Sequence, residues 1–199
     1  MIDLSTTLGN AWFSSPLFTA SGCASSGKEL AQFIDLREIG AVVTKSVMSK
    51  PRHGRATPRM AETPSGMINS IGLQGPGIDQ FLAHDLPWLV SQKARVIVSI
   101  AGETVEEYAT LARKVRSAPG ISALEVNISC PNVENRGLVF ACDPDASRRV
   151  IDGVRKTLGG ELPIIAKLSP DVTDLVSIAR GVVDAGADGL ALINTVLSM

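Results

Sequence analysis

One cysteine, Cys130, lies just after a short apolar segment and directly before a proline. Residues 123–128 alternate in character and are rich in β-branched side chains, as strands are. Pro131 cannot continue a hydrogen-bonded ladder, so the thiol belongs at the carboxyl edge of the strand. Parallel α/β folds bind ligands at that edge. Flanked by the carboxamides of Asn127 and Asn132, the thiol is a candidate base or nucleophile. On strand position alone, a small buried apolar side chain is an equally good interpretation.

Two lysines, Lys45 and Lys167, lie at or near the ends of the apolar segments 41–44 and 164–168. A lysine in an apolar strand is costly unless its ammonium meets an anion, a carbonyl group or water. A side chain that reaches out to solvent at the strand end is the alternative. Because the pattern occurs on two strands, a functional role is favoured.

Two loops carry further candidate groups. Ser21-Gly22 closes the first apolar segment and offers a hydroxyl and close backbone approach to a ligand, although an ordinary turn explains it equally well. The connection from 46 to about 95 is long enough to be a lid or binding loop. Within its glycine-rich part, Asn69 either presents its amide to a planar polar ligand or occupies a turn.

The spacing of apolar segments predicts the elements that hold these residues. The later segments start at residues 96, 123, 164 and 189, which leaves room for a helix in each gap and indicates a parallel sheet. Helices are expected to start near Thr104, Asp143 and Asp174, the first with a capping box to Glu107. The expected strands are Leu17–Ala20, Ala41–Lys45, Val96–Ile100, Ala123–Ile128, Ile164–Leu168 and Gly189–Asn194.

Both an open doubly wound sheet and a closed (β/α)₈ barrel fit this alternation of strands and helices. No G-x-G-x-x-G motif follows a strand, which counts against a dinucleotide-binding sheet. Polar residues end five different strands, as they do at the top of a barrel; these residues are Lys45, Ser99, Asn127, Lys167 and Asn194. The sequence therefore predicts a single (β/α)₈ TIM barrel domain over 1–199. It is expected to be incomplete, with about six of eight strands, and truncated at its C-terminus.

Composition narrows the class of function. A formal net charge of −1 over 199 residues gives no electrostatic reason to expect nucleic acid or a membrane surface as partner. No apolar run approaches the ~18 residues of a membrane span. Three cysteines without metal-ligand spacing predict neither a disulfide framework nor a metal site, and they suit a reducing cytoplasm.

Taken together, these residues resemble the class 1 dihydroorotate dehydrogenases. The resemblance covers the whole chain in order, and its most specific part is the motif at 127–132. Residues 133–140 are more similar to class 1B than to class 1A. The other matching segments are Ala20-Ser21-Gly22, Lys45, 69–74, 167–170 and 193–195. The resemblance implies an FMN-containing (β/α)₈ barrel.

The resemblance also implies residue roles in oxidising dihydroorotate to orotate for pyrimidine biosynthesis. Cys130 would remove a proton alpha to a carbonyl group while flavin accepts a hydride from the adjacent carbon. Lys45 would lie between flavin and substrate and share the catalytic role, and Lys167 would stabilise negative charge on the reduced ring. The implied substrate-binding residues are Lys45, Asn69, Ser70, Ile71, Gly72, Leu73, Asn127, Asn132, Asn194 and Thr195. The implied FMN-binding residues are Ser21, Gly22, Lys45, Ser46, Ser99, Asn127, Lys167 and Ile193.

Class 1B enzymes pair this catalytic subunit with a second subunit that carries FAD and a [2Fe–2S] cluster, and they use NAD⁺ as acceptor. A homodimer of the catalytic subunit is expected. Class 1A, a homodimer that uses fumarate, is the nearest alternative. A barrel aldolase with Lys45 or Lys167 as Schiff-base lysine and an inactive barrel fragment are the other two.

Two departures from the family pattern concern the flavin. Ser99 stands where the family commonly has asparagine, and a serine keeps a donor but has a shorter reach. The glycine-rich loops that hold the flavin phosphate after the seventh and eighth strands are absent from the sequence. The chain alone is therefore expected to bind FMN weakly or not at all.

Overall fold

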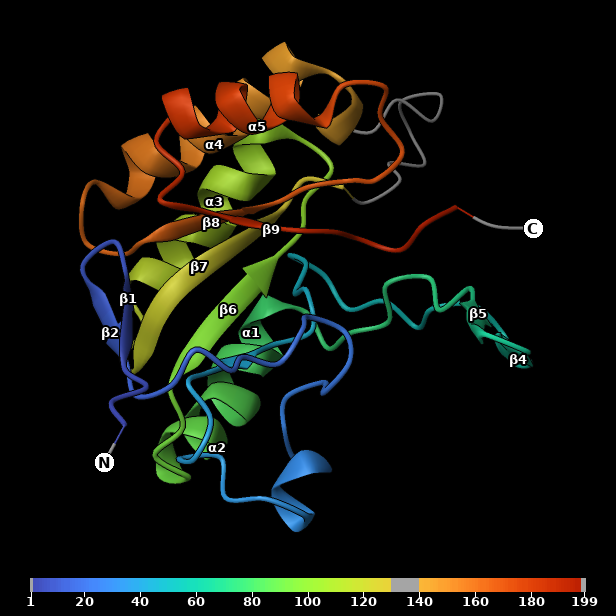
Figure 1. The fold of residues 1–199 in the computed structure, drawn as a ribbon, viewed down its shortest axis with the longest axis vertical. Coiled ribbons are helices and arrows are strands. Elements are labelled where there is room, and N and C mark those ends of the chain that lie inside the picture. The colour runs from blue at the N-terminus through green and yellow to red at the C-terminus, as the bar shows by residue number, and fades with distance from the viewer. Residues whose placement is uncertain (1, 130–139, 198–199) are drawn as a thin grey trace.

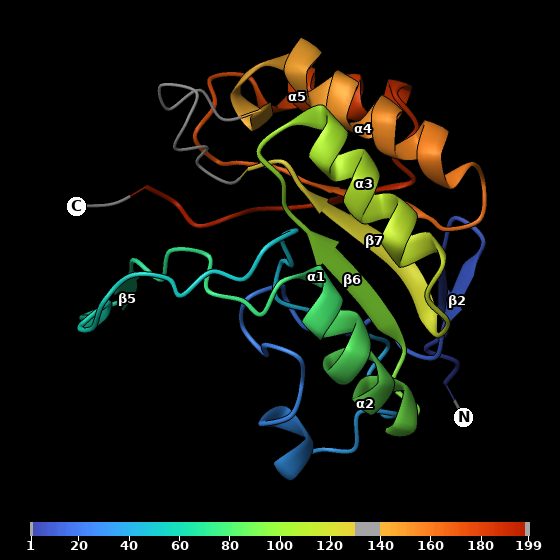
Figure 2. The same cartoon turned by 180° about the vertical axis from the view of Figure 1, so that it is seen from behind.

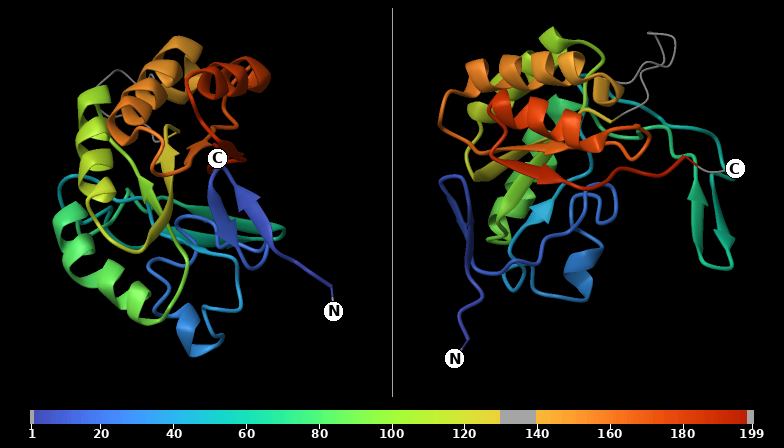
Figure 3. Two further views of the ribbon diagram at one scale, coloured as in Figure 1. Left: turned by 90° about the vertical axis from the view of Figure 1, so that its left-hand side faces the viewer. Right: turned by 45° about the horizontal axis from the view of Figure 1, so that its top comes forward.

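The computed structural model describes residues 2–129 and 140–197. A parallel sheet with strand order β3-β6-β7-β8-β9 forms its centre (Figure 1). The strands are β3 (Val42–Val43), β6 (Val96–Ile100), β7 (Ile121–Asn127), β8 (Ile164–Lys167) and β9 (Gly189–Ala191). Within this sheet the strands lie side by side in the order in which the chain forms them. The sheet curls with its helices on the outside, as βα units of a partial barrel do (Figure 3).

Three long helices cover the outer face of the sheet: α3 (Val105–Arg116), α4 (Pro144–Leu158) and α5 (Leu175–Asp184) (Figure 2). Their predicted starts are confirmed by side-chain caps, since the hydroxyl of Thr104 and the carboxylates of Asp143 and Asp174 all accept backbone N–H groups. No helix in the described residues is both long and apolar enough to cross a membrane.

The return bond of the capping box at α3 goes one residue earlier than expected. The Glu107 carboxylate accepts from the backbone N–H of Glu103 at 2.7 Å, whereas a capping box uses the N-cap residue itself. The predicted helix start is therefore correct, and only the partner of the return bond differs.

The two faces of the sheet carry different side chains because successive residues of a strand point to opposite sides. On the outer face, Leu124 and Val126 of β7 belong to the large core shared with the helices. The inner face begins with an apolar layer made of Phe13, Ala41, Val43, Ile97, Ala123 and Ile165. Towards the carboxyl ends of the strands it becomes polar, with Ser99, Glu125, Asn127 and Lys167 all buried.

An N-terminal hairpin closes the amino end of the curled sheet. It consists of β1 (Thr6–Leu8) and β2 (Ala11–Phe13), paired antiparallel, and lies across the starts of the later strands (Figure 3). The side chain of Phe13 is fully buried in the apolar inner layer. This hairpin is not among the elements expected from the sequence.

The expected strand at 17–20 is reduced to one parallel bridge between Phe18 and Ala41, so the described sheet has five strands beside the predicted six. The side chain of Thr19 replaces part of the backbone pairing expected between this segment and β3. Its hydroxyl accepts from the backbone N–H of Val43 at 2.8 Å and also contacts the carbonyl of that residue at 3.3 Å. A threonine hydroxyl that bonds to backbone groups competes with main-chain pairing.

The expected long loop from 46 to 95 contains regular structure. A hairpin of β4 (Met60–Thr63) and β5 (Gly66–Asn69) projects from the body of the molecule (Figure 1). A continuous helical segment follows, made of α1 (Ile78–Gln80), a π-helical turn (Phe81–Asp85) and α2 (Leu86–Ser91). The part of this connection that can act as a binding loop is therefore much shorter than predicted.

Pro87 explains why the helical segment at 78–91 was missed. A proline inside an apolar pattern argues against a helix because it lacks the backbone donor. The chain accommodates it with a π-helical turn, in which the backbone N–H of Leu86 donates to the carbonyl of Phe81, five residues back.

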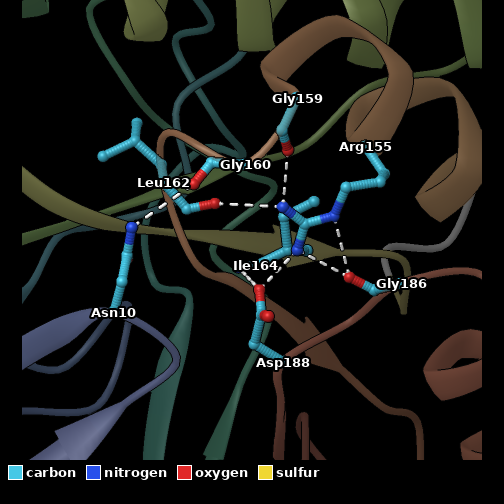
Figure 4. Close-up of polar contacts among 8 residues, drawn as sticks. All are labelled: Asn10, Arg155, Gly159, Gly160, Leu162, Ile164, Gly186 and Asp188. Atoms are coloured by element: carbon cyan, nitrogen blue, oxygen red, sulfur yellow. Dashed lines mark hydrogen bonds and ion pairs between the residues drawn. The ribbon is translucent and has the colours of Figure 1, made fainter.

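The partly buried Arg155 of α4 links the loops at the amino end of the sheet (Figure 4). Its guanidinium pairs with the carboxylate of Asp188, which also accepts from the backbone N–H of Ile164 at 2.7 Å. The same guanidinium donates to the carbonyl oxygens of Gly186 (2.6 Å), Gly159 (2.8 Å) and Leu162 (3.3 Å). One side chain thus ties α4 to the loops that precede β8 and β9.

Replacing Arg155 with lysine is expected to lower the free energy of unfolding by about 2 kcal/mol. Lysine keeps the charge but cannot reach several carbonyls in a planar fork. Urea denaturation of the two proteins measures the difference. The matched control is Lys156→Ala, the next residue along α4, which makes only an exposed i,i+4 pair with Asp152. We expect that change to stay within ~0.5 kcal/mol. An Arg155→Lys protein as stable as the wild type contradicts the role of the fork.

Candidate active site

The carboxyl ends of the strands bring the polar side chains of the inner face together. Ser99 of β6 is in register with Glu125 of β7, and Asn127 of β7 is in register with Lys167 of β8. Ser46 comes from the segment after β3. All five side chains are buried. Strand register therefore places residues that are far apart in sequence on one surface.

Three hydrogen bonds link four of these side chains in a row. The Asn127 amide Nδ2 donates to the Ser46 hydroxyl at 3.0 Å. The hydroxyls of Ser46 and Ser99 are bonded at 2.9 Å, and the Ser99 hydroxyl donates to the Glu125 carboxylate at 2.7 Å. We call Asn127, Ser46, Ser99 and Glu125 the buried polar chain.

The carbonyl end of the Asn127 amide has donors of its own. Its Oδ1 accepts from the backbone N–H of Ser129 at 3.2 Å, from the Ser129 hydroxyl at 2.9 Å and from Nδ2 of Asn194 at 3.2 Å. Asn194 is placed by its own backbone N–H, which donates to the carbonyl of Leu168. Helix α3 adds the Tyr108 hydroxyl, which donates to the backbone carbonyl of Asn127 at 2.7 Å. Asn127 is thus held from several elements.

The two predicted lysines both lie beside the turn at Ser21-Gly22. The Lys167 ammonium donates to the Ser21 hydroxyl at 2.9 Å, although the two residues are 146 positions apart. The Lys45 ammonium lies 3.6 Å from the place where a Cβ on Gly22 would stand. Lys167 is only 8% exposed, so solvent does not account for its position. The geometry favours the functional interpretation of Lys167 over a side chain that reaches solvent.

Several other predicted site residues are less buried than this cluster. Asn69 and Ser70, at the end of the projecting hairpin, are exposed, and so are Ile193 and Thr195 after β9. Leu73 is nearer, because it packs against Met48 and Ala101 beside the carboxyl end of β6. Ile71 and Gly72 join the hairpin to Leu73 and are half-buried. Cys130 and Asn132 lie outside the described residues.

Sequence reasoning missed Glu125. The signal was present, because Glu125 lies two residues before Asn127 and so faces the same side of the strand. A glutamate in the middle of an apolar strand is unusual, since a buried charge requires partners. Here it is 4% exposed and bonded to Ser99.

Cys142 is a poor candidate for a catalytic base. Burial, and after it the negative charge of Asp171, raise the pKa of the Cys142 thiol. A raised pKa lowers the fraction of thiolate near neutral pH. Within the described residues, no group of histidine, cysteine and acidic side chains could hold a metal ion.

Comparison with known proteins gives one consistent family. The family model described as "Dihydroorotate dehydrogenase" matches residues 3–199. The chain is 48% identical over 197 residues to the "Dihydroorotate dehydrogenase B (NAD(+)), catalytic subunit" of Geotalea uraniireducens, covering 99% of this chain and 64% of that protein. The protein of the same name from Bacillus cytotoxicus is 45% identical over 184 residues, which are 92% of this chain and 59% of that protein.

The fold also matches a solved structure. The crystal structure of DHODH from Eimeria tenella in complex with ferulenol superposes with a TM-score of 0.81 at 20% identity, covering 99% of this chain and 61% of that chain. Likeness at this identity speaks for the fold alone, and the curled parallel sheet of five strands is consistent with part of a TIM barrel. The chain spans 64% and 59% of the two curated relatives, so it corresponds to under two thirds of their length.

Replacing Asp171 with asparagine is expected to speed alkylation of Cys142. Removing the nearby negative charge lowers the thiol pKa and raises the thiolate fraction at pH 8, so the rate should rise. Mass spectrometry after timed iodoacetamide treatment follows this residue. Asp184→Asn, at the far end of α5, is the control and should leave the rate unchanged. An unaltered rate in Asp171→Asn shows that the charge has no influence on this thiol.

Proposed function

The chain belongs to the dihydroorotate dehydrogenase family, and from this premise we propose that the protein oxidises dihydroorotate to orotate in pyrimidine biosynthesis. The observation that carries the proposal is the convergence of buried polar side chains at the carboxyl ends of β6, β7 and β8. Lysines, serines and asparagines meet there around one surface, which suits a planar ligand rich in carbonyl and N–H groups.

The residues at this end of the sheet fit FMN. The Lys167 ammonium, held by Ser21, offers a cation to a flavin pyrimidine edge. The hydroxyl of Ser46 and the amide of Asn127 offer donors and acceptors of the kind that a flavin ring requires. Glycine at position 22 leaves space beside the Lys45 ammonium. The proposed FMN-binding residues are Ser21, Gly22, Lys45, Ser46, Ser99, Asn127, Lys167 and Ile193.

In the proposed mechanism, Cys130 removes the proton alpha to the substrate carbonyl as a general base. In the sequence Cys130 directly follows Ser129, whose hydroxyl is bonded to Asn127 in the polar cluster. When bound, FMN supplies the acceptor for the hydride from the adjacent carbon. The Lys167 ammonium stabilises the negative charge that this transfer leaves on the ring.

Asparagines are proposed to orient the substrate through directed hydrogen bonds. Asn127 and Asn194 are already bonded to each other at 3.2 Å. Lys45 and Asn132 are proposed to bind the substrate as well, on the strength of the sequence resemblance. The residues from Asn69 to Leu73 are proposed to cover the substrate from the loop that begins at the projecting hairpin, with Thr195 added from the segment after β9.

We assign the protein to class 1B within this proposal. The support is the name shared by its relatives, each of which is the catalytic subunit of a B-type, NAD(+)-dependent enzyme. The proposed partners are a second copy of the chain and a subunit with FAD and a [2Fe–2S] cluster, acting in the cytoplasm. Membership of the family favours dehydrogenation over a Schiff-base aldolase.

Replacing Cys130 with serine in the full-length, FMN-loaded enzyme is expected to lower kcat for dihydroorotate by about 10²–10⁴-fold, because a hydroxyl is a much weaker base than a thiolate. Stopped-flow bleaching of the flavin absorbance measures the step. Cys142→Ser is the matched control and should retain wild-type turnover. Turnover at the wild-type level in Cys130→Ser rules out this residue as the base.

The electron acceptor separates the two enzyme classes. We expect the full-length FMN protein alone to reduce neither fumarate nor NAD⁺ at a useful rate, and to reduce NAD⁺ once a subunit with FAD and a [2Fe–2S] cluster is added. Steady-state assays with dihydroorotate and each acceptor measure this. Rapid fumarate reduction by the protein alone assigns it to class 1A instead.

A further inference from the structure

We propose that Glu125 is a positioning residue, whose carboxylate fixes the direction of the buried polar chain and with it the orientation of the Asn127 amide. The inference rests on the proposed function, because it concerns how Asn127 is presented to the ligands of that site. None of the mechanistic steps described above uses Glu125. Its side chain is nevertheless buried at 4% exposure, in register with Ser99 of the neighbouring strand.

The carboxylate end of the chain can act in one direction only. An ionised carboxylate accepts hydrogen bonds and donates none. The Ser99 hydroxyl, 2.7 Å from Oε1 of Glu125, therefore directs its hydrogen at the carboxylate. The backbone N–H of Ser99 has a different partner, since it donates to the hydroxyl of Thr44 at 3.1 Å.

The direction then passes to Ser46. A hydroxyl has one hydrogen, so Ser99 can only accept in its 2.9 Å bond with Ser46. Ser46 thus gives its own hydrogen to Ser99 and must accept from its next neighbour. That neighbour is the Asn127 amide, whose Nδ2 lies 3.0 Å away. Every hydrogen in the row points from Asn127 towards Glu125.

The opposite end of the Asn127 amide agrees with this direction. The backbone N–H of Ser129 can only donate, and it donates to Oδ1 of Asn127 at 3.2 Å. A carboxylate at one end and a backbone donor at the other thus enclose an amide and two hydroxyls that could otherwise rotate. Such enclosed networks specify one arrangement because each reversal leaves a buried group unsatisfied.

The fixed amide also determines what Asn194 offers. Its Nδ2 donates to Oδ1 of Asn127 and to the Ser129 hydroxyl at 2.5 Å, so both amide hydrogens have partners. The remaining group of this side chain is the acceptor Oδ1, which already takes the backbone N–H of Thr195 at 2.7 Å. Asn194 therefore presents its acceptor Oδ1, and not its amide hydrogens, to a ligand, and this orientation depends on Glu125 through Asn127.

The test uses the full-length, FMN-loaded enzyme and the product orotate as probe, with Kd measured from the change in flavin absorbance. Glu125→Gln keeps the size of the side chain but adds a donor, so the row is free to reverse. Ser99→Ala cuts the row in the middle. We expect each change to raise the orotate Kd about tenfold, as the loss of one buried hydrogen bond does. Ser15→Ala, which removes a buried hydroxyl outside the row, is the control and should not change the Kd.

The double variant separates positioning from general weakening. If both residues act through one row, Glu125→Gln combined with Ser99→Ala should bind orotate no more weakly than the poorer single variant. Additive losses, or wild-type Kd in Glu125→Gln, overturn the proposal. If Glu125→Gln fails to fold, Ser99→Ala decides, since an unchanged Kd there also overturns it. A wild-type protein that neither binds orotate nor oxidises dihydroorotate refutes the proposed function, which is a different outcome.

Discussion

The two-residue alternation of side chains along β6, β7 and β8 is the constraint on which the rest of the molecule depends. It assigns one set of residues to the helices and the other to the inside of the curled sheet. On β7 the side chains that face inward change from apolar to polar towards the carboxyl end, from Ala123 through Glu125 to Asn127. The parallel register then places inward-facing residues of neighbouring strands at the same level. The strands alone therefore give the inner face an apolar layer at the amino end and a polar one at the carboxyl end, before any loop contributes.

The apolar end of the inner face contributes to stability, whereas the polar end carries the groups of the proposed site. At the amino end, Phe13 fills the apolar layer and Arg155 ties the loops before β8 and β9. These contacts hold together the elements at this end of the sheet. At the carboxyl end, charged and amide side chains are buried at a cost that packing does not recover. Barrels tolerate this arrangement because the two ends of their strands are supported by different loops.

Sequence reasoning succeeded where one pattern controlled the outcome. The strands β6, β7 and β8 and the starts of α3, α4 and α5 follow from alternation and capping, and the resemblance to dihydroorotate dehydrogenases was confirmed over almost the whole chain. It failed where a side chain overrode the backbone pattern, as Thr19 does at the expected first strand. Pro87 concealed a helix for a related reason, since a π-helical turn removes the conflict that proline creates. The partners of Glu125 depend on register between strands, which no local pattern contains.

The bond between Lys167 and Ser21 has a consequence for how the protein is made. It joins residues 146 positions apart, so on a ribosome adding about 5–20 residues per second the serine waits roughly 7–30 s for its partner. Until β8 emerges, the nascent chain has the first turn of the site without the cation that completes it. A ligand that depends on this ammonium can therefore bind only after most of this chain has been made.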